Sequence, residues 1–292
     1  MKLGIIGNRE KPELTEAVAL FLRCLDKHNV DYVIDEEIGK LLSLEGKKSA
    51  RMKSAPREEC VSAGDILVAF GGDGTILSAA RSVGSAAIPV LGINLGKLGF
   101  LAEVAPAEIQ EAVHDLIQNR YVVEERLILR GTAPDLRSGA FHAVNDIVVS
   151  KGRSSRLIDL ETHINGAYAV TYRGDGLIVS TPTGSTAYAL SSGGPIVIPT
   201  SSVLCLTPIS PHTLSGRPLV VPDDSIIRLV ANAPDGEILV SADGQEEAYS
   251  SKPLEIVIAK AEYKLRLVKR FSRSYFDVLR AKLLWGKDPR SH

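Results

Sequence analysis

The sequence predicts a parallel α/β domain of the Rossmann-like kind, followed by a β-sandwich-like domain. The chain has 292 residues, and at about 150 residues per domain that length favours two domains. Apolar runs alternate with amphipathic segments up to about residue 125, and helical periodicity then disappears. We therefore expect domains at residues 1–125 and 126–270, with a C-terminal helix in 271–292 that can pack back on the first domain.

Short apolar runs in the first part predict the strands of a parallel sheet. Strands covered on both faces are almost wholly apolar, as the run Asp65–Phe70 is. Stripes at helical spacing, Leu14–Leu25 and Ile109–Ile117, lie between such runs, and strand-helix-strand alternation indicates crossover connections. The predicted strands are Lys2–Ile6, Tyr32–Ile34, Asp65–Phe70 and Ile88–Ile93.

The second part contains short strand-like runs broken by Gly, Asn, Asp or Ser, a pattern typical of a β-sandwich. Helical spacing returns at Phe276–Trp285. The predicted strands are Arg126–Arg130, Phe141–Ser150, Leu157–Ile164, Ala167–Tyr172, Leu177–Ser180, Leu219–Val221, Ile226–Val230, Ile238–Ser241, Leu254–Ile258 and Tyr263–Val268.

Composition excludes several classes of partner. The chain has 34 Lys and Arg against 35 Asp and Glu, so it has no basic field for nucleic acid. No apolar run reaches the roughly 18 residues of a membrane span, which predicts no membrane partner and a cytoplasmic location. Cys24, Cys60 and Cys205 lie far apart, which predicts neither a disulfide framework nor a zinc site. The histidines have no metal-ligand spacing, so we expect no metal held by protein groups alone.

The sharpest local feature is Gly71-Gly72-Asp73-Gly74-Thr75, between a buried strand and a predicted helix. In an open parallel sheet, ligands bind beyond the carboxyl ends of the strands. The glycines let a ligand approach the backbone, and a helix N-terminus attracts phosphate. Asp73 can accept a proton or hold a metal that carries phosphates. The same pattern also fits a tight turn in which Asp73 caps the helix.

Other nucleotide and hydrolase motifs are absent. Gly92–Leu98 is one residue short of a Walker motif and has Leu98 in place of Ser or Thr. No G-x-G-x-x-G follows the first strand, and Thr183–Ala187 lacks the second glycine of a nucleophile elbow. A P-loop ATPase, a dehydrogenase and a serine hydrolase are therefore disfavoured.

Three polar groups interrupt the apolar strands of the second part: Asn145-Asp146, Arg173–Gly176 and Thr181–Tyr188. Small hydroxyls and amides can hydrogen-bond a ribose or an amide, and Tyr188 can close over a ligand. Each group also fits an ordinary hairpin turn or helix start. The polar stretch Glu45–Glu59 is interpreted as a solvated loop, with a flap over an anionic ligand as the alternative.

Together these segments resemble the ATP-NAD kinase family over nearly the whole chain. The most specific segments are Thr181–Tyr188 and Pro211–Pro218. The resemblance runs through Gly71–Thr75, Asn94–Leu101, Asn145-Asp146, Asp175–Tyr188, Pro211–Pro218 and Asp243-Gly244-Gln245.

The resemblance implies a role for each matching residue. Asp73 matches the catalytic aspartate, which also contacts NAD, and Asp146 stands where many members carry Glu. Gly71, Gly72, Gly74 and Thr75 match the phosphate loop. The implied NAD-binding residues are Asp73, Gly74, Asn145, Asp146, Arg156, Arg173, Asp175, Thr186, Ala187, Tyr188, Ser191 and Gln245.

The resemblance also implies an activity. NAD and ATP are the implied substrates, and Mg²⁺ is the implied metal, carried with ATP. The γ-phosphate would pass to the 2′-hydroxyl of the adenosine ribose of NAD, giving NADP. Asp73 would accept the hydroxyl proton late in the attack, because a carboxylate with an ordinary pKa of about 3.9 is a weak base.

The sequence defines less well which cationic side chains face the triphosphate and how many subunits assemble. Candidate cations for the triphosphate are Arg81, Lys97 and the pair Arg51 and Lys53. The resemblance further implies a homodimer or homotetramer, in which a neighbouring subunit reaches part of the NAD.

Two other functions remain open from the sequence. A diacylglycerol-type lipid kinase shares the GGDGT element but needs a way to approach a bilayer, and the chain has no amphipathic basic helix or apolar tail. A non-catalytic NADP(H) sensor could keep the fold, although a pure binder has no use for a base at Asp73.

Overall fold

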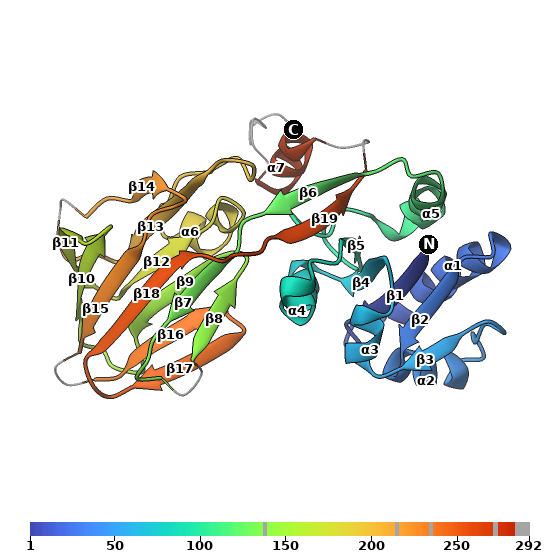
Figure 1. The fold of residues 1–292 in the computed structure, drawn as a ribbon, viewed down its shortest axis with the longest axis horizontal. Coiled ribbons are helices and arrows are strands. Elements are labelled where there is room, and N and C mark those ends of the chain that lie inside the picture. Colours follow the sequence, from blue (N-terminus) through green and yellow to red (C-terminus); the bar gives the residue numbers. More distant parts are fainter. Residues whose placement is uncertain (137–138, 214–215, 234–235, 271–273, 284–292) are drawn as a thin grey trace, which may run out of the picture. The chain divides into compact units, whose positions relative to one another are not determined.

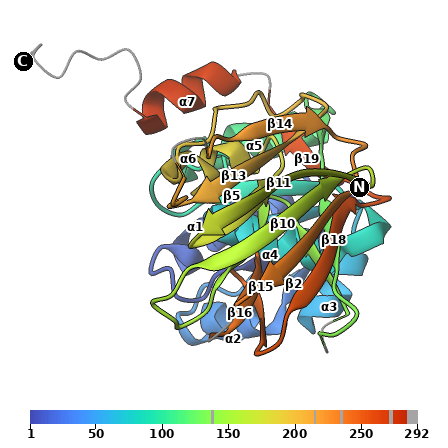
Figure 2. The ribbon, with the colours of Figure 1, turned by 90° about the vertical axis from the view of Figure 1, so that its left-hand side faces the viewer.

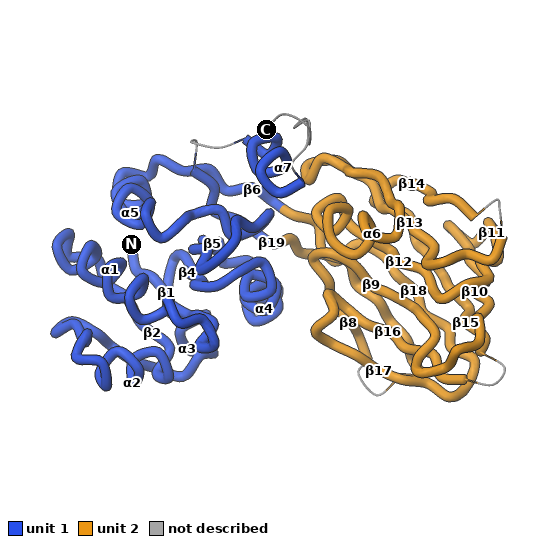
Figure 3. The backbone as a smooth tube through the Cα atoms, turned by 180° about the vertical axis from the view of Figure 1, so that it is seen from behind, with its two compact units in different colours: residues 1–125, 265–292 blue, residues 126–264 orange. Residues whose placement is uncertain are grey.

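The computed structural model describes residues 1–136, 139–213, 216–233, 236–270 and 274–283. The chain forms two compact units, residues 1–125 with 265–292 and residues 126–264 (Figure 3). The first is a parallel α/β unit and the second an antiparallel sandwich-like unit, which confirms the predicted fold class. Among the described residues, no helix combines the length and the apolar character needed to cross a membrane.

Unit 1 is built on a seven-stranded sheet in the order β3-β2-β1-β4-β5-β19-β6 (Figure 1). The strand pairs from β3 through β19 are parallel. The strands are β1 (Lys2–Gly7), β2 (Asp31–Asp35), β3 (Lys53–Ala55), β4 (Ile66–Gly71), β5 (Val90–Asn94), β6 (Val122–Arg126) and β19 (Leu265–Lys269). The helices are α1 (Leu14–Lys27), α2 (Glu36–Leu44), α3 (Arg57–Ser62), α4 (Asp73–Val83), α5 (Ile109–Ile117) and α7 (Tyr275–Leu283), with short 3₁₀ turns η1 (Gly84–Ala86) and η2 (Pro106–Glu108).

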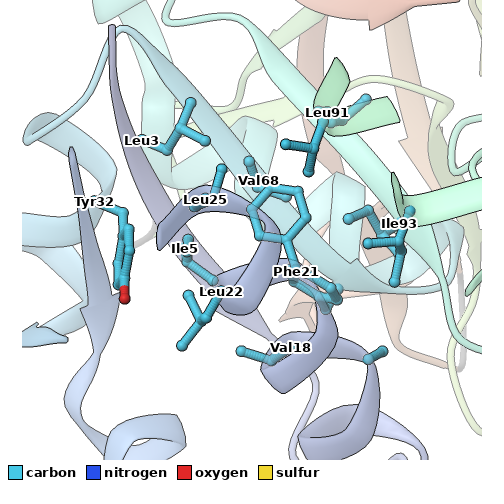
Figure 4. Close-up of a cluster of buried hydrophobic side chains, with 14 of the residues drawn as sticks. Leu3, Ile5, Val18, Phe21, Leu22, Leu25, Tyr32, Val68, Leu91 and Ile93 are labelled. Carbon is cyan, nitrogen blue, oxygen red and sulfur yellow. The ribbon is translucent and has the colours of Figure 1, made fainter. Parts of the chain in front are cut away.

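The core of unit 1 forms where the apolar stripe of α1 meets the sheet (Figure 4). Phe21 and Leu22 are buried against sheet residues such as Ile5 and Val68. The ring of Phe21 meets that of Phe70 edge-on, with centroids 5.4 Å apart. All six residues of β4 are buried, as expected for a central parallel strand with helices on both faces.

The structure corrects the predicted division of the chain at one strand. The sequence pattern assigns the run Tyr263–Val268 to the second domain, but β19 lies in the sheet of unit 1 between β5 and β6. Leu265, Leu267 and Val268 are buried there. A short apolar run carries no information on its partner strand, because pairing is decided by tertiary contacts. Helices α2 and α3 and strands β3 and β6 were also not predicted from the sequence. The predicted strand Arg126–Arg130 spans the gap between the end of β6 at Arg126 and the start of β7 at Leu129.

Unit 2 contains two six-stranded sheets, ordered β11-β10-β15-β18-β7-β8 and β14-β13-β12-β9-β16-β17. Figure 2 shows β11, β10, β15 and β18 side by side. Its helical turns are η3 (Gly184–Thr186) and α6 (Tyr188–Ser191). The strands are β7 (Leu129–Thr132), β8 (Ala140–Ala143), β9 (Asp146–Lys151), β10 (Ile158–Ile164), β11 (Ala167–Gly174), β12 (Gly176–Ser180), β13 (Val203–Ile209), β14 (Leu219–Pro222), β15 (Ile227–Asn232), β16 (Ile238–Ala242), β17 (Glu246–Ser250) and β18 (Leu254–Lys260).

Alternating burial along these strands makes the core between the two sheets. In β18, for example, Leu254, Ile256 and Ile258 are buried while Glu255 is exposed, the pattern of a strand with one face on a core. Two strands, β13 and β17, were not predicted from the sequence. The single predicted run Phe141–Ser150 forms two strands, β8 and β9, which separate at Val144 and Asn145.

Candidate active site

The loop Gly71–Thr75 lies at the carboxyl edge of the unit 1 sheet. Gly71 pairs with Asn94 of the neighbouring parallel strand, so the loops after β4 and β5 leave the sheet together. The backbone N–H of Leu95 donates to the carbonyl of Gly71 over 2.9 Å. A Cβ on Gly71 would lie 2.1 Å from the Thr75 hydroxyl oxygen, so only glycine allows this tight closure.

Asp73 does not cap α4, so the capping role in the alternative interpretation of this loop is wrong. The N-cap residue is Gly72, which has no side chain to cap the first N–H groups of the helix. Asp73 is the first residue of α4 and reaches across to the loop after β5. The start of α4 thus keeps the positive dipole end that attracts phosphate.

The Asp73 carboxylate is held by backbone N–H groups from three consecutive residues. Oδ2 accepts from Phe100 over 2.9 Å, and Oδ1 accepts from Leu101 over 2.9 Å and Ala102 over 3.1 Å. These hydrogen bonds fix the carboxylate while leaving a lone pair of Oδ2 for a further donor, since each oxygen accepts about two.

Gly99 is required by the position of this carboxylate. A Cβ at Gly99 would lie 2.0 Å from Asp73 Oδ1, which no real contact permits. The loop is further shaped by Asn94, whose side-chain amide donates to the Lys97 carbonyl over 2.7 Å. The segment Asn94–Leu101 therefore serves as a support for Asp73, a role that was not predicted from the sequence.

The candidate cations for a triphosphate are spread over unit 1. Lys97 follows β5 at the carboxyl edge of the sheet and is exposed. Arg81 lies in the last turn of α4, with its backbone about 12 Å along the helix from Asp73 at 1.5 Å per residue.

Arg51 and Lys53 are also in the wrong place for the phosphate loop. Arg51 donates to the side chains of Asn29 and Asp31, which lie at the amino end of β2. That is the opposite edge of the parallel sheet from Gly71. Lys53 pairs with Val33 in the outermost strand, β3.

The stretch Glu45–Glu59 is partly regular, since it contains β3 and the start of α3. The hydroxyl of Thr15 donates to Glu45 over 2.7 Å, and Ser49 donates to Asp26 over 2.6 Å. These bonds tie the stretch to α1.

In unit 2, Asn145 and Asp146 are held by the turn between β16 and β17. The Asp243 carboxylate accepts the backbone N–H groups of Val144, Asn145 and Asp146 over 2.9, 2.7 and 3.2 Å. The Asp243 N–H donates back to the Asp146 carbonyl over 3.0 Å. Asp243 takes a positive φ of 53°, a conformation that Asp tolerates better than most residues. Asp243 thus organises the corner formed by Val144, Asn145 and Asp146. The sequence did not lead us to assign Asp243 itself to the site.

Asp146 is a buried carboxyl with a strongly shifted proton affinity. Only 4% of the residue is exposed. Burial, followed by the nearby charge of Asp243, raises the pKa of Asp146 to about 7. Desolvation and a like charge both disfavour a carboxylate. Such a shift is frequent at functional sites.

The segment Thr181–Tyr188 packs directly on this corner. The Thr181 hydroxyl donates to the Val144 carbonyl over 2.6 Å, and the Thr181 N–H donates to the Asn145 carbonyl over 2.8 Å. A Cβ on Gly184 would lie 2.1 Å from that carbonyl oxygen. The segment then forms η3 and α6, with Thr186 and Ala187 half-buried and Tyr188 and Ser191 exposed. Exposed Gln245 follows Asp243 by two residues.

Arg156, Arg173 and Asp175 form a separate group at the other end of β12. Asp146 pairs with Ser180, whereas Gly176 pairs with Ser150, so β12 separates the two groups by about 13 Å at 3.3 Å per residue. Arg156 and Arg173 line a cavity of about 420 Å³ with Ser154, Ser155, Leu157, Ile158, Ala233 and Gly236. Asp175 forms an ion pair with Lys151 at 2.7 Å.

The geometry of unit 1 defines the class of protein. A glycine-lined helix N-terminus can receive phosphates, and a fixed carboxylate beside it can receive a proton, which are the parts a phosphotransferase needs. No group of three or more His, Cys, Asp or Glu side chains that could hold a metal occurs within the described part of the chain.

Comparison with known proteins identifies the family. Residues 3–121 match the ATP-NAD kinase N-terminal domain, and residues 144–270 match the ATP-NAD kinase C-terminal domain. The chain is 40% identical over 291 residues to an NAD kinase of Bacteroides fragilis, covering 99% of this chain and 100% of that one. It is 42% identical over 287 residues to an NAD kinase of Moorella thermoacetica, covering 98% of this chain and 90% of that one. The chain belongs to the ATP-NAD kinase family.

Two solved structures share the fold over nearly the whole chain. Yeast NADH kinase in complex with NADH matches with a TM-score of 0.89 and 29% identity, covering 100% of this chain and 90% of that one. An NAD kinase from Archaeoglobus fulgidus in complex with ATP matches with a TM-score of 0.75 and 26% identity, covering 96% and 99%. The findings support NAD kinase function, a phosphotransferase activity with NAD and ATP as substrates, over a lipid kinase or a sensor.

Proposed function

We propose that the chain transfers the γ-phosphate of ATP to the 2′-hydroxyl of the adenosine ribose of NAD, giving NADP and ADP. The observation that carries this proposal is the Asp73 carboxylate, which three backbone N–H groups fix beside the start of α4. The attacking hydroxyl oxygen forms a bond to the γ-phosphorus, and the bond from that phosphorus to the bridging oxygen of ADP breaks. The hydroxyl proton passes to Asp73.

The phosphates of ATP are assigned to Gly71, Gly72, Gly74 and Thr75. These residues end β4 and begin α4, where backbone N–H groups and the helix dipole favour an anion. We assign Mg²⁺ to the triphosphate. Mg²⁺ in such sites usually keeps several waters and binds largely through the substrate phosphates. The bound ion would neutralise charge on the phosphates.

The NAD is assigned to the corner organised by Asp243. Asn145 and Asp146 would hydrogen-bond the nucleotide, and Tyr188 would cover it, with Thr186, Ala187, Ser191 and Gln245 around them. The support for this assignment is the convergence of Asn145, Thr181 and Asp243 through hydrogen bonds of 2.6 to 3.2 Å.

We further propose that Arg173 and Asp175 contact the NAD of a neighbouring copy in a homodimer or homotetramer. Their position at the far end of β12 from Asp146 supports this arrangement. The test mixes chains carrying Asp146→Ala with chains carrying Asp175→Ala. Mixed oligomers contain sites with neither lesion, so activity should return on mixing. If both variants are inactive alone and mixing restores nothing, Asp175 does not serve a neighbouring site.

The central test incubates the purified chain with NAD, ATP and Mg²⁺ and detects NADP with an NADP-specific dehydrogenase. Wild-type chain should form NADP, and the Asp73→Asn variant should lose activity by about 10²–10⁴-fold, the usual contribution of a general base. Asn keeps one acceptor oxygen, so the variant should fold. Undiminished turnover by Asp73→Asn would remove Asp73 from the mechanism, and tight NADP binding without any turnover would favour the sensor.

A further inference from the structure

The C-terminal helix α7 brings a lysine to the proposed catalytic base. Lys282 Nζ lies 3.8 Å from Asp73 Oδ2 and 5.1 Å from the centroid of the Phe100 ring. Phe100 is also one of the three residues whose N–H groups hold Asp73. Tyr275, at the start of α7, lies near the same ring, with its own ring centroid 6.5 Å from that of Phe100.

The contact between Lys282 and Asp73 differs from a structural ion pair. At 3.8 Å the two atoms are beyond direct hydrogen-bond distance, and the side chains keep 30% and 28% of their surface exposed. In the same unit, Lys269 donates directly to Glu103, and its side chain is only 7% exposed. Lys282 is therefore held mainly by charge and by the Phe100 ring. No hydrogen bond to another described residue engages its three N–H donors, which leaves them for a ligand.

The oxygen that faces Lys282 is the one with room for a substrate. Oδ1 of Asp73 accepts two backbone N–H groups, whereas Oδ2 accepts one. The remaining lone pair of Oδ2 is where a hydroxyl proton would go. A phosphoryl group attacked by that hydroxyl therefore arrives within reach of the Lys282 ammonium.

A cation is favourable at this position, because the Asp73 carboxylate and an approaching phosphoryl group carry charge of the same sign and repel each other. The ammonium of Lys282 cancels that repulsion and can donate to the phosphoryl oxygens, on which charge is spread in the transition state.

We propose that Lys282 is a catalytic residue that contacts the transferring phosphoryl group, and that α7 is therefore part of the active site. This inference rests on the proposed function, because it assigns Lys282 to the reaction at Asp73. The helix is anchored for this role by Val278 and Leu279, each with 1% of its surface exposed.

The test compares Lys282→Met, Lys282→Arg and the matched control Arg280→Met in the full chain. Met keeps an unbranched side chain over Phe100 and removes the charge. Arg280 lies on the same helix, pairs with Asp277 and is 58% exposed. The readouts are kcat, the KM values for NAD and ATP, and the unfolding midpoint.

Lys282→Met should lower kcat by about 10- to 100-fold, the equivalent of one hydrogen bond to a charged group. The KM for NAD and the unfolding midpoint should change little. Lys282→Arg should recover most of the lost kcat, and Arg280→Met should match wild type.

Three results would overturn the proposal: an unchanged kcat in Lys282→Met, an increased kcat, or equal losses in the Met and Arg variants accompanied by a lower unfolding midpoint. Wild-type chain in the same assay separates this failure from that of the proposed function. If wild type forms no NADP, the proposed function fails. If wild type forms NADP and Lys282→Met does so equally well, only the role of Lys282 fails.

Discussion

Asp73 is positioned by a glycine 26 residues later in the sequence, and this dependence can be tested. A Cβ at Gly99 would lie 2.0 Å from Asp73 Oδ1, so Gly99→Ala must displace the carboxylate from the N–H groups that hold it. We expect kcat to fall strongly while the chain stays folded. Steady-state kinetics and circular dichroism provide the measurement.

Gly72→Ala is the matched comparison for this prediction. A Cβ at Gly72 meets nothing within 4 Å, and its φ of −111° suits any residue. This variant should leave Asp73 in place and raise the KM for ATP, because the added methyl group crowds bound phosphate. We assign Asn94–Leu101 to the support of Asp73 and Gly71–Thr75 to phosphate binding. Equal effects of Gly99→Ala and Gly72→Ala on kcat and on the KM for ATP would contradict these separate roles.

The raised pKa of Asp146 predicts a pH dependence in NAD binding. With a pKa of about 7, Asp146 is mostly protonated at pH 6 and mostly ionised at pH 8. An ionised carboxyl accepts hydrogen bonds from an amide or amino group better than a protonated one. The KM for NAD should therefore fall as pH rises from 6 to 8. In Asp146→Asn this dependence should disappear, and a dependence that persists would assign it to another group.

The raised pKa of Asp146 also makes the free energy of unfolding depend on pH. Higher pH favours NAD binding but lowers the stability of the fold. The pKa of Asp146 in the folded chain lies above the ordinary value of about 3.9, so the folded state holds the proton more tightly than the unfolded state. This group therefore lowers the free energy of unfolding as pH rises from about 4 to about 7, and no further above that. Asp146→Asn should flatten that part of the stability curve, measured by urea unfolding at several pH values.

Among the structural elements, the turn between β16 and β17 controls the proposed NAD corner through Asp243. Asp243→Ala leaves the N–H groups of Val144, Asn145 and Asp146 without their acceptor. The expected loss is about 1–3 kcal/mol of unfolding free energy, together with a higher KM for NAD. Asp243→Asn keeps an acceptor and tolerates the positive φ, so it should lose less. Equal losses would show that the hydrogen bonds do not carry the effect.

The end of β19 is fixed by ion pairs to the segment around α5. Lys269 donates to Glu103, and Arg270 donates to Asp115 over 2.8 Å and to Glu111 over 3.1 Å. Lys269→Met removes a hydrogen bond between charged groups, one of them with a side chain that is only 7% exposed, so we expect a loss of about 1.5–3 kcal/mol in urea unfolding. The exposed pair of Arg228 and Glu255 gives the control, because Arg228→Met should change stability little.

At the scale of the whole molecule, the division of the chain predicts how its fragments behave. Residues 126–264 contain both sheets of unit 2 and its core, so this fragment should fold alone. Residues 1–125 lack β19, which lies between β5 and β6, and should fold poorly. Co-expression with residues 265–292 should improve solubility, measured by yield and circular dichroism. A stable fragment 1–125 would show that β19 is dispensable for the sheet.

The sequence determined the features that depend on local patterns. Apolar runs and helical stripes predicted β1, β4 and α1, because a buried strand and an amphipathic helix each have a recognisable period. The position of Gly71–Thr75 at the end of a buried strand predicted a phosphate site, and the family motifs predicted the activity.

The tertiary structure decided which distant residues meet. Phe100 and Lys282 at Asp73, and Asp243 at Asn145, are separated in sequence by 27, 209 and 98 residues, and no local pattern records such contacts. The same is true of β19, which completes the sheet of unit 1 from the far end of the chain, and of Arg51, which lies at the wrong edge for a phosphate. Periodicity reports which face of an element is buried, whereas pairing and side-chain contacts depend on the packing of the whole unit.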